Sequence, residues 1–171
     1  MTTQAIHDRR LTRLTDLFDA DSRGENIGYG PGAGRLREAF ADIRHQAGQL
    51  RATHQARHGD TRVEHDLLRR TRVSIRFGTL NHCTMNDDDP TGAKCLEDAV
   101  VPAGHQGPLI DRCRPSRCAN SVIAPEHLPI WRTEHTSLDQ LLDQPGLPSG
   151  RRAHIDAQLA EVDLVIRKAT P

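Results

Sequence analysis

The residues best suited to do chemistry are the only four cysteines of the 171-residue chain: Cys83, Cys95, Cys113 and Cys118. The last two have four residues between them, a short spacing of the kind found in zinc sites, and Pro115 within the pair favours a tight turn. The first two have 11 residues between them, but the segment that joins them is rich in Asp, Pro and Gly and could fold back. The pattern predicts one metal site built from all four thiols.

We expect the metal to be Zn²⁺ in a structural role. Four thiolates complete a tetrahedral shell and leave no open position for a substrate water, which a catalytic zinc needs. Their formal charge with the metal is −2, and the neighbouring arginines are placed to offset it: Arg112, Arg114 and Arg117. Two alternatives stay open. In one, His82 or His105 replaces a cysteine as ligand, and in the other the cysteines are unligated or redox-active.

Compartment and thiol chemistry agree with this expectation. The N-terminal residues contain no apolar run typical of a targeting signal, and no segment approaches the length and hydropathy of a membrane span. We therefore expect a cytoplasmic protein with no membrane partner. Thiols stay reduced in the cytoplasm, where clustered cysteines favour metal binding over disulfides.

Arginine is the second chemical feature. The 23 basic residues comprise 21 Arg and two Lys, against 23 acidic residues. Residues 1–80 carry 14 Arg and 10 acids, a balance of +4, whereas residues 81–171 carry 9 basic and 13 acidic residues, a balance of −4. Guanidinium groups grip phosphate oxygens in pairs, so this half is the expected DNA-contacting part. The residues we select are Arg69, Arg70 and Arg72; the alternative is that they form an ordinary solvated helix face.

Several short segments in the second half support a resemblance. They are Phe77 to Cys83, Ala93-Lys94-Cys95, Cys113 to Ser121, and His127-Leu128-Pro129-Ile130-Trp131. In order and spacing, residues from about 77 to 166 resemble the C-terminal cysteine-rich region of large phage-integrase-type tyrosine recombinases of mobile elements. The resemblance implies a small appendage to a catalytic domain, with the four cysteines as metal ligands, and a link to DNA integration.

The catalytic residues of that family do not carry over. His7 to Arg10 and His54 to Arg57 match the His-x-x-Arg pattern, but about one such match is expected by chance in a chain with this His and Arg content. The only tyrosine, Tyr29, lies between glycines and lacks the surroundings that activate a nucleophile. We therefore expect no enzyme activity and assign no catalytic or cofactor-binding residue.

Hydrophobic periodicity indicates which elements position these groups. Apolar residues recur at helical spacing over residues 3–20, and Leu36, Phe40, Ile43, Ala47, Leu50 and His54 form a seam in a helix expected from Gly34 to His58. Residues 28–34 are expected to be an irregular loop. A second helix should present Val63 and Leu67, and the alternation at Val73, Ile75 and Phe77 favours extended chain. Two further periodic segments around the breaker at 144–148 predict an antiparallel helical hairpin.

The expected fold is therefore mainly α: amphipathic helices and a C-terminal helical hairpin around a zinc-stapled loop module. We divide the chain into an Arg-rich helical region (1–76), a four-cysteine zinc module (77–124) and the hairpin (125–171). The expected function is a non-enzymatic DNA-binding or recombinase-associated accessory module, whose partners would be DNA, a tyrosine recombinase or a second copy. The rivals are a protein-assembly module without nucleic-acid affinity and a metal-dependent nuclease.

Overall fold

The computed structural model describes residues 3–53, 55, 57 and 59–170. Over these residues the protein has five α-helices, two short 3-10 turns and one ladder of two short strands, so the prediction of a mainly α fold is confirmed. No helix in the same ranges is both long and apolar enough to cross a membrane.

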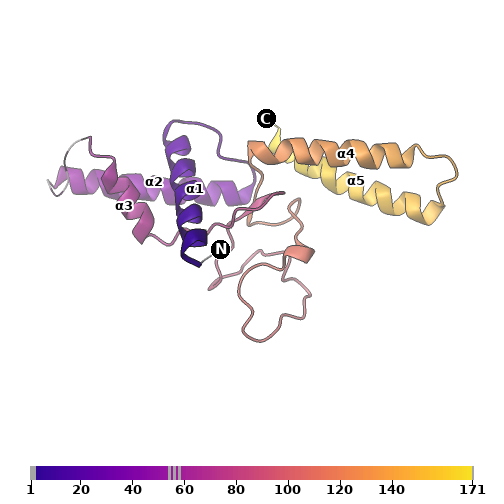
Figure 1. Cartoon of the computed structure of the whole chain (residues 1–171), viewed down its shortest axis with the longest axis horizontal. Helices are drawn as coiled ribbons and strands as arrows, with labels where there is room; N and C mark the ends of the chain where they lie inside the picture. The colour runs from indigo at the N-terminus through magenta and orange to yellow at the C-terminus, as the bar shows by residue number, and fades with distance from the viewer. Residues whose placement is uncertain (1–2, 54, 56, 58, 171) are drawn as a thin grey trace.

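The largest apolar cluster lies among the first three helices, α1 (Thr3–Ser22), α2 (Pro31–Ala52) and α3 (Arg62–Arg70). Figure 1 shows α1 and α3 lying across α2. The predicted seam of α2 is buried at Leu36, Phe40 and Ile43, and the Phe40 ring meets Phe18 of α1 edge to face at 5.2 Å. Burial of this stripe is what joins the helices.

Both predicted helices of this region differ in detail from the structure. Helix α2 begins three residues early and ends at Ala52, while the predicted seam residue His54 lies outside the described residues. In α3 the buried residue is Leu68, whereas Val63 and Leu67 are half-buried. Helix α3 contacts both α1 and α2. One stripe of apolar residues at helical spacing therefore does not identify which of its side chains are buried.

The glycine-rich stretch is divided between irregular chain, in which Tyr29 forms an isolated bridge with Ile123, and the start of α2. This division corrects the expectation of a continuous loop. Pro31 is the first residue of the helix, where its fixed φ suits a helix start and its missing N–H loses no hydrogen bond. Gly28 and Gly30 precede it with φ of 137° and 97°, values that favour glycine. A Cβ on Gly32 would lie 2.8 Å from the carbonyl oxygen of Ser121, so this glycine allows α2 to approach the strand that contains Ser121.

That strand is β2 (Ser121–Val122), which pairs antiparallel with β1 (His82–Cys83), so that His82 lies opposite Val122 and Cys83 opposite Ser121. Val122 belongs to the apolar cluster of the first three helices, which ties the ladder to α2. Before β1, Val73 and Ile75 are buried on extended backbone, as the alternation predicts.

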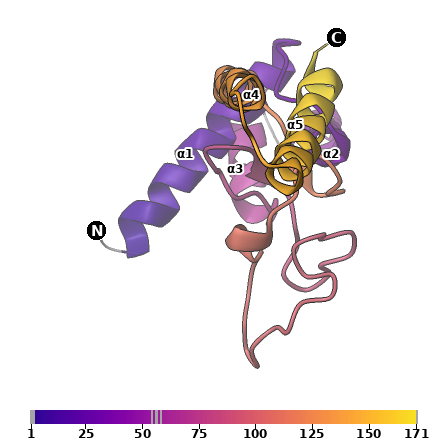
Figure 2. The same cartoon turned by 90° about the vertical axis from the view of Figure 1, so that its right-hand side faces the viewer.

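Helices α4 (Leu128–Leu142) and α5 (Ser149–Ala169) form the predicted antiparallel hairpin, which extends away from the other helices (Figure 1) and is seen nearly end-on in Figure 2. Leu138, Ile155 and Val162 are buried between the two helices. At the base of the hairpin, Val165 packs with Ile123, the residue after β2. The hairpin is thus attached next to the ladder.

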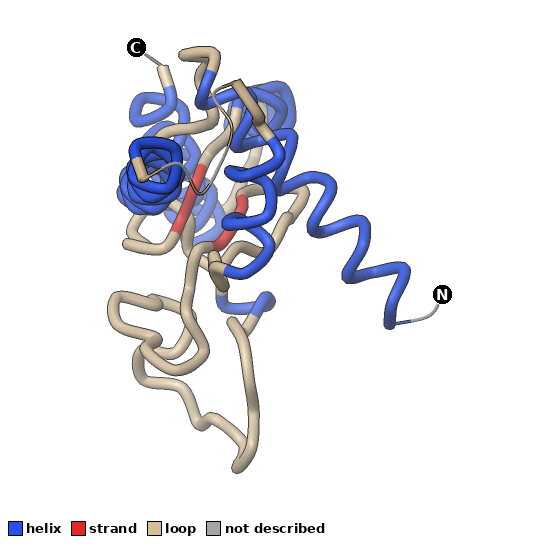
Figure 3. Tube along the Cα trace, turned by 90° about the vertical axis from the view of Figure 1, so that its left-hand side faces the viewer, coloured by secondary structure: helices blue, strands red, loops and turns tan. Residues whose placement is uncertain are grey.

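Residues 84–120 join the two strands almost without regular structure, apart from one 3-10 turn at Ile110–Arg112. Figure 3 shows them as loops below the helices. Their own buried apolar cluster comprises Met85, Ala93 and Cys95. A loop of this length with so small a core needs a further source of order.

Candidate metal centre and basic groove

The four cysteines come from separate parts of the chain but line one cavity of about 410 Å³. Cys83 is on β1, Cys95 lies within the turn that the Leu96 N–H closes on the Ala93 carbonyl, and Cys113 follows the 3-10 turn. Cys118 closes a turn in which its backbone N–H donates to the Arg114 carbonyl at 3.1 Å. The structure therefore gathers the cysteines that the sequence predicts as one site.

Burial and the neighbouring thiols make two of the four cysteines, Cys83 and Cys113, reluctant to ionise without a cation. Burial, and next the Cys118, Cys83 and Cys95 thiols, raise the pKa of Cys113 to about 11. Burial is also the largest cause of the raised pKa of Cys83. A divalent cation between the sulfurs would remove this repulsion, and thiolate sulfur is the ligand that Zn²⁺ prefers in structural sites. The donor set therefore fits zinc.

Two thiols now donate weak hydrogen bonds to oxygen atoms. Cys113 Sγ donates to the Asn81 side-chain carbonyl at 3.7 Å, and Cys118 Sγ donates to the Gly92 carbonyl at 3.6 Å. Among the described residues, a group of three potential metal ligands has donor atoms that all lie within 4.8 Å of one another, and this group contains no cysteine. Four sulfur atoms bound to one zinc ion lie closer together than 4.8 Å, because each Zn–S bond is only about 2.3 Å long. Metal binding would therefore draw the loop inward and exchange these hydrogen bonds for metal bonds.

Of the three arginines expected to offset the thiolate charge, one lines the cavity and two bind other groups. Arg114 lines the cavity. Arg117 pairs with Glu161 of α5, and Arg112 donates to the Glu97 carbonyl at 3.2 Å. Glu161 also accepts a hydrogen bond from Ser116, so the turn between Cys113 and Cys118 is tied to the hairpin.

The two histidines considered as replacement ligands point to other partners. Side chains of adjacent strand residues lie on opposite faces, and His82 accordingly contacts Glu126 at 3.2 Å on the face opposite Cys83. His105 bonds the Gly107 carbonyl at 3.1 Å and does not line the cysteine cavity. Neither histidine lines the cavity that the four cysteines share.

Sequence reasoning missed the compact group of three metal-ligand types formed by His82, Glu126 and His127. The two histidines are buried and their ring centroids lie 4.4 Å apart. Burial, and next the neighbouring His127, lower the pKa of His82 to about 4, so its ring is neutral at pH 7. Alternation along β1 could have indicated that His82 turns away from the thiols, but no sequence signal pairs it with the start of α4.

Hydrogen bonding at His127 decides what this group can do. The Ala124 N–H donates to His127 Nδ1 at 2.9 Å, so the ring proton is on Nε2, which faces the Gly78 carbonyl at 3.2 Å. Both nitrogens are therefore engaged with backbone, and the ring has no free lone pair for a metal. The group is a structural joint between the ladder and α4, and as it stands it gives no support to a metal-dependent nuclease.

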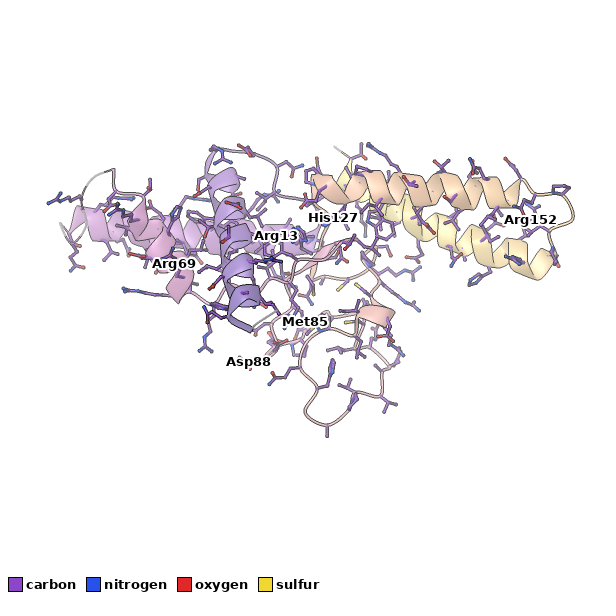
Figure 4. The ribbon with its side chains drawn as sticks, viewed as in Figure 1. Arg13, Arg69, Met85, Asp88, His127 and Arg152 are labelled. Carbon is purple, nitrogen blue, oxygen red and sulfur yellow. The ribbon has the colours of Figure 1, made fainter. Side chains whose placement is uncertain are left out.

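Arg69, Arg70 and Arg72 are exposed at the end of α3 and just beyond it. No carboxylate in the described part of the chain forms an ion pair with any of the three. Figure 4 shows Arg69 on the side of the molecule away from the hairpin, whereas Arg152 lies at the hairpin's far end.

Two of these arginines share a groove with α1. Arg69, Arg72 and Arg10 line a groove of about 530 Å³ between α3 and α1, and His7 lies on the same wall. Arg10 Nη2 also donates to the Val73 carbonyl at 3.4 Å, which holds its guanidinium group at the groove. The sequence did not place Arg10 here, because its position depends on how α1 crosses α2.

No protein-family model, curated protein or solved structure matches the chain. The resemblance to recombinase C-terminal regions therefore rests on the residues alone.

Proposed function

We propose that the protein is a non-enzymatic DNA-binding module with a structural zinc ion, acting in the cytoplasm in the integration or recombination of mobile DNA. The DNA-binding part is supported by one observation above all: Arg10, Arg69 and Arg72, from two different helices, line a single groove. The link to recombination, including a recombinase as partner, rests on the likeness of residues 77–166.

Phosphate is the ligand class that fits the groove. Guanidinium groups bind two phosphate oxygens at once, and those without an internal carboxylate partner need break no ion pair to do so. With Arg70 beside the groove, four arginines are available for phosphate contacts. Neutralising about four phosphates gives a slope of roughly −3.6 in log K against log salt. Binding should be weak and largely independent of sequence, because phosphate contacts carry no base information.

Zinc would be held by Cys83, Cys95, Cys113 and Cys118, and it would supply stability rather than reactivity. By joining turns far apart in sequence, it would order the loops between β1 and β2 and the turn that Glu161 and Arg117 tie to α5. Structural sites of this kind contribute directly to folding.

A charge-matched comparison tests the DNA proposal. Arg69, Arg70 and Arg72 are replaced together by Ala, and the control replaces Arg132, Arg151 and Arg152 of the hairpin, which are likewise exposed. Fluorescence anisotropy with a short labelled duplex is measured over a range of salt concentrations. The first variant should lose most of its affinity and reduce the salt slope by about three, whereas the control should stay close to wild type. Equal losses in both variants would mean that net charge, and not this groove, determines binding.

Protein assembly without nucleic-acid affinity is the second candidate function. It is favoured by apolar side chains exposed around the cysteine module: Leu80, Val100, Val101 and Ile110. A flat anisotropy curve for wild type at low ionic strength, together with a mass above that of one chain in light scattering, would select this function over DNA binding.

A further inference from the structure

The arginine groove is also lined by acidic residues. Asn86, Asp87 and Asp88, in the segment after β1, line the same groove as Arg69 and Arg72. Figure 4 shows Asp88 near Met85, below the N-terminal part of α1. We call residues 86–89 the acidic turn. The Asp87 and Asp88 carboxylates thus share the groove with the arginines proposed to bind phosphate.

The acidic turn is held in place by bonds to the chain before β1. Arg76 Nη2 donates to both carboxylate oxygens of Asp87, at 2.6 and 2.5 Å. The Met85 carbonyl accepts from Ser74 Oγ at 2.5 Å and from Arg76 Nη1 at 2.9 Å. These bonds hold the turn at the groove, which Ser74 and Arg76 also line.

The charges of the groove are therefore only partly compensated. Asp87 neutralises Arg76, while Asp88 is exposed and forms no ion pair with a described residue. Arg10, Arg69 and Arg72 thus share a groove with the unpaired carboxylate of Asp88, which would repel a phosphate bound there.

We infer that the acidic turn is an autoinhibitory element, which competes with the DNA backbone for the arginine groove and must be displaced or repelled when DNA binds. This inference rests on the proposed DNA-binding function. The turn lowers affinity for phosphate without closing the groove, and its removal strengthens binding. It also discriminates against weakly charged anions, because only a ligand with several phosphates offers enough contacts to overcome the repulsion.

The test uses the full chain and removes charge without changing side-chain size. Asp88→Asn leaves the Arg76–Asp87 pair intact, and Asp87→Asn with Asp88→Asn removes both carboxylates. The control, Asp139→Asn with Asp156→Asn, removes two exposed carboxylates from the hairpin. Affinity for a short fluorescein-labelled duplex is measured by anisotropy as a function of salt, and circular dichroism confirms that each variant is folded.

Asp88→Asn should bind about fivefold more tightly than wild type at low salt, which is what one unit charge about 4 Å away is worth in water. The double variant should bind more tightly still. The salt slope should steepen by about one only in the double variant, because Arg76, released from Asp87, can then neutralise one further phosphate and release its counterion from the DNA. Asp88→Asn alone frees no arginine and should leave the slope close to that of wild type. The hairpin control should change affinity less than twofold.

Unchanged affinity in the two acidic-turn variants, or an equal gain in the hairpin control, would overturn the inference while leaving the DNA-binding function standing. Absence of binding by wild type and by every variant at low salt would overturn both. Binding by the variants but not by wild type would support the inference in its strongest form.

Discussion

Removing the zinc proposed for the four cysteines should melt the segment between β1 and β2 and leave the helical core in place. The segment's own buried apolar cluster comprises three side chains, Met85, Ala93 and Cys95. Full burial of a methionine is worth about 1.5–3 kcal/mol, whereas structural zinc in small modules contributes on the order of 10 kcal/mol. The metal should therefore supply most of the local stability. If about 4 kcal/mol of this contribution opposes local opening, the protection of the local amides against hydrogen exchange should fall about a thousandfold when zinc is chelated.

Hydrogen exchange measured by mass spectrometry, with and without a zinc chelator, tests this expectation. Amides of residues 84–120 should lose protection, whereas those near Phe40 in α2 should keep it, because that core contains none of the four cysteines. Elemental analysis should find one zinc per chain, and Cys113→Ser or Cys118→Ser should release it. His105→Ala is the control and should retain the metal, since His105 lies outside the cavity.

Two results would refute this reasoning. One is a purified protein without zinc whose four thiols all react freely in the folded state. The other is loss of zinc in the His105→Ala variant, which would mean that the ligand set has been misassigned.

Two further predictions concern the contacts around the metal module. Gly32→Ala should destabilise the protein by about 1–3 kcal/mol in thermal unfolding. The added Cβ would lie 2.8 Å from the Ser121 carbonyl oxygen and 2.9 Å from that of Asn120. The matched control is Gly34→Ala, whose Cβ would meet nothing within 4 Å and which should be neutral or slightly stabilising. The hydrogen bond from Ser116, followed by the Arg117 ion pair, lowers the pKa of Glu161, so this contact stabilises the fold at neutral pH and is lost as the pH falls below about 4.5. Glu161→Gln should remove that acid dependence and speed hydrogen exchange around Ser116 at pH 7, and an unchanged exchange rate would show that the contact does not restrain the turn.

The elements that sequence predicts well are those with long periodic patterns. The α2 seam and the two helices of the hairpin each repeat over several turns, so the buried stripe identifies both the helix and its inner face. The ladder was not predictable, because two-residue strands have no periodicity and their partners, such as His82 and Val122, lie 40 positions apart. The sequence predicts the start of α2 too late, because the glycines around Pro31 favour a loop while Pro31 itself favours the first position of a helix.

The candidate sites also differ in how far the sequence predicts their residues. Cysteine is rare enough in this chain that type and spacing alone predicted which residues gather. The arginine groove was predicted only on the α3 side, since the contribution of Arg10 arises from the crossing of two helices. The acidic turn was visible in sequence as a run of aspartates, but only the Arg76–Asp87 pair reveals which surface it faces.

The antiparallel pairing of Cys83 with Ser121 also bears on how such a chain could arise. Because the two ends of the intervening segment lie side by side, residues 84–120 could be exchanged for a tight turn without moving the strands or the helices behind them. Loop length itself carries little entropic cost beyond the first few residues. Residues 84–120 therefore have the geometry of an insertion into a smaller helical protein. Selection could alter the charge or the cysteines of this segment while the helical core stays unchanged.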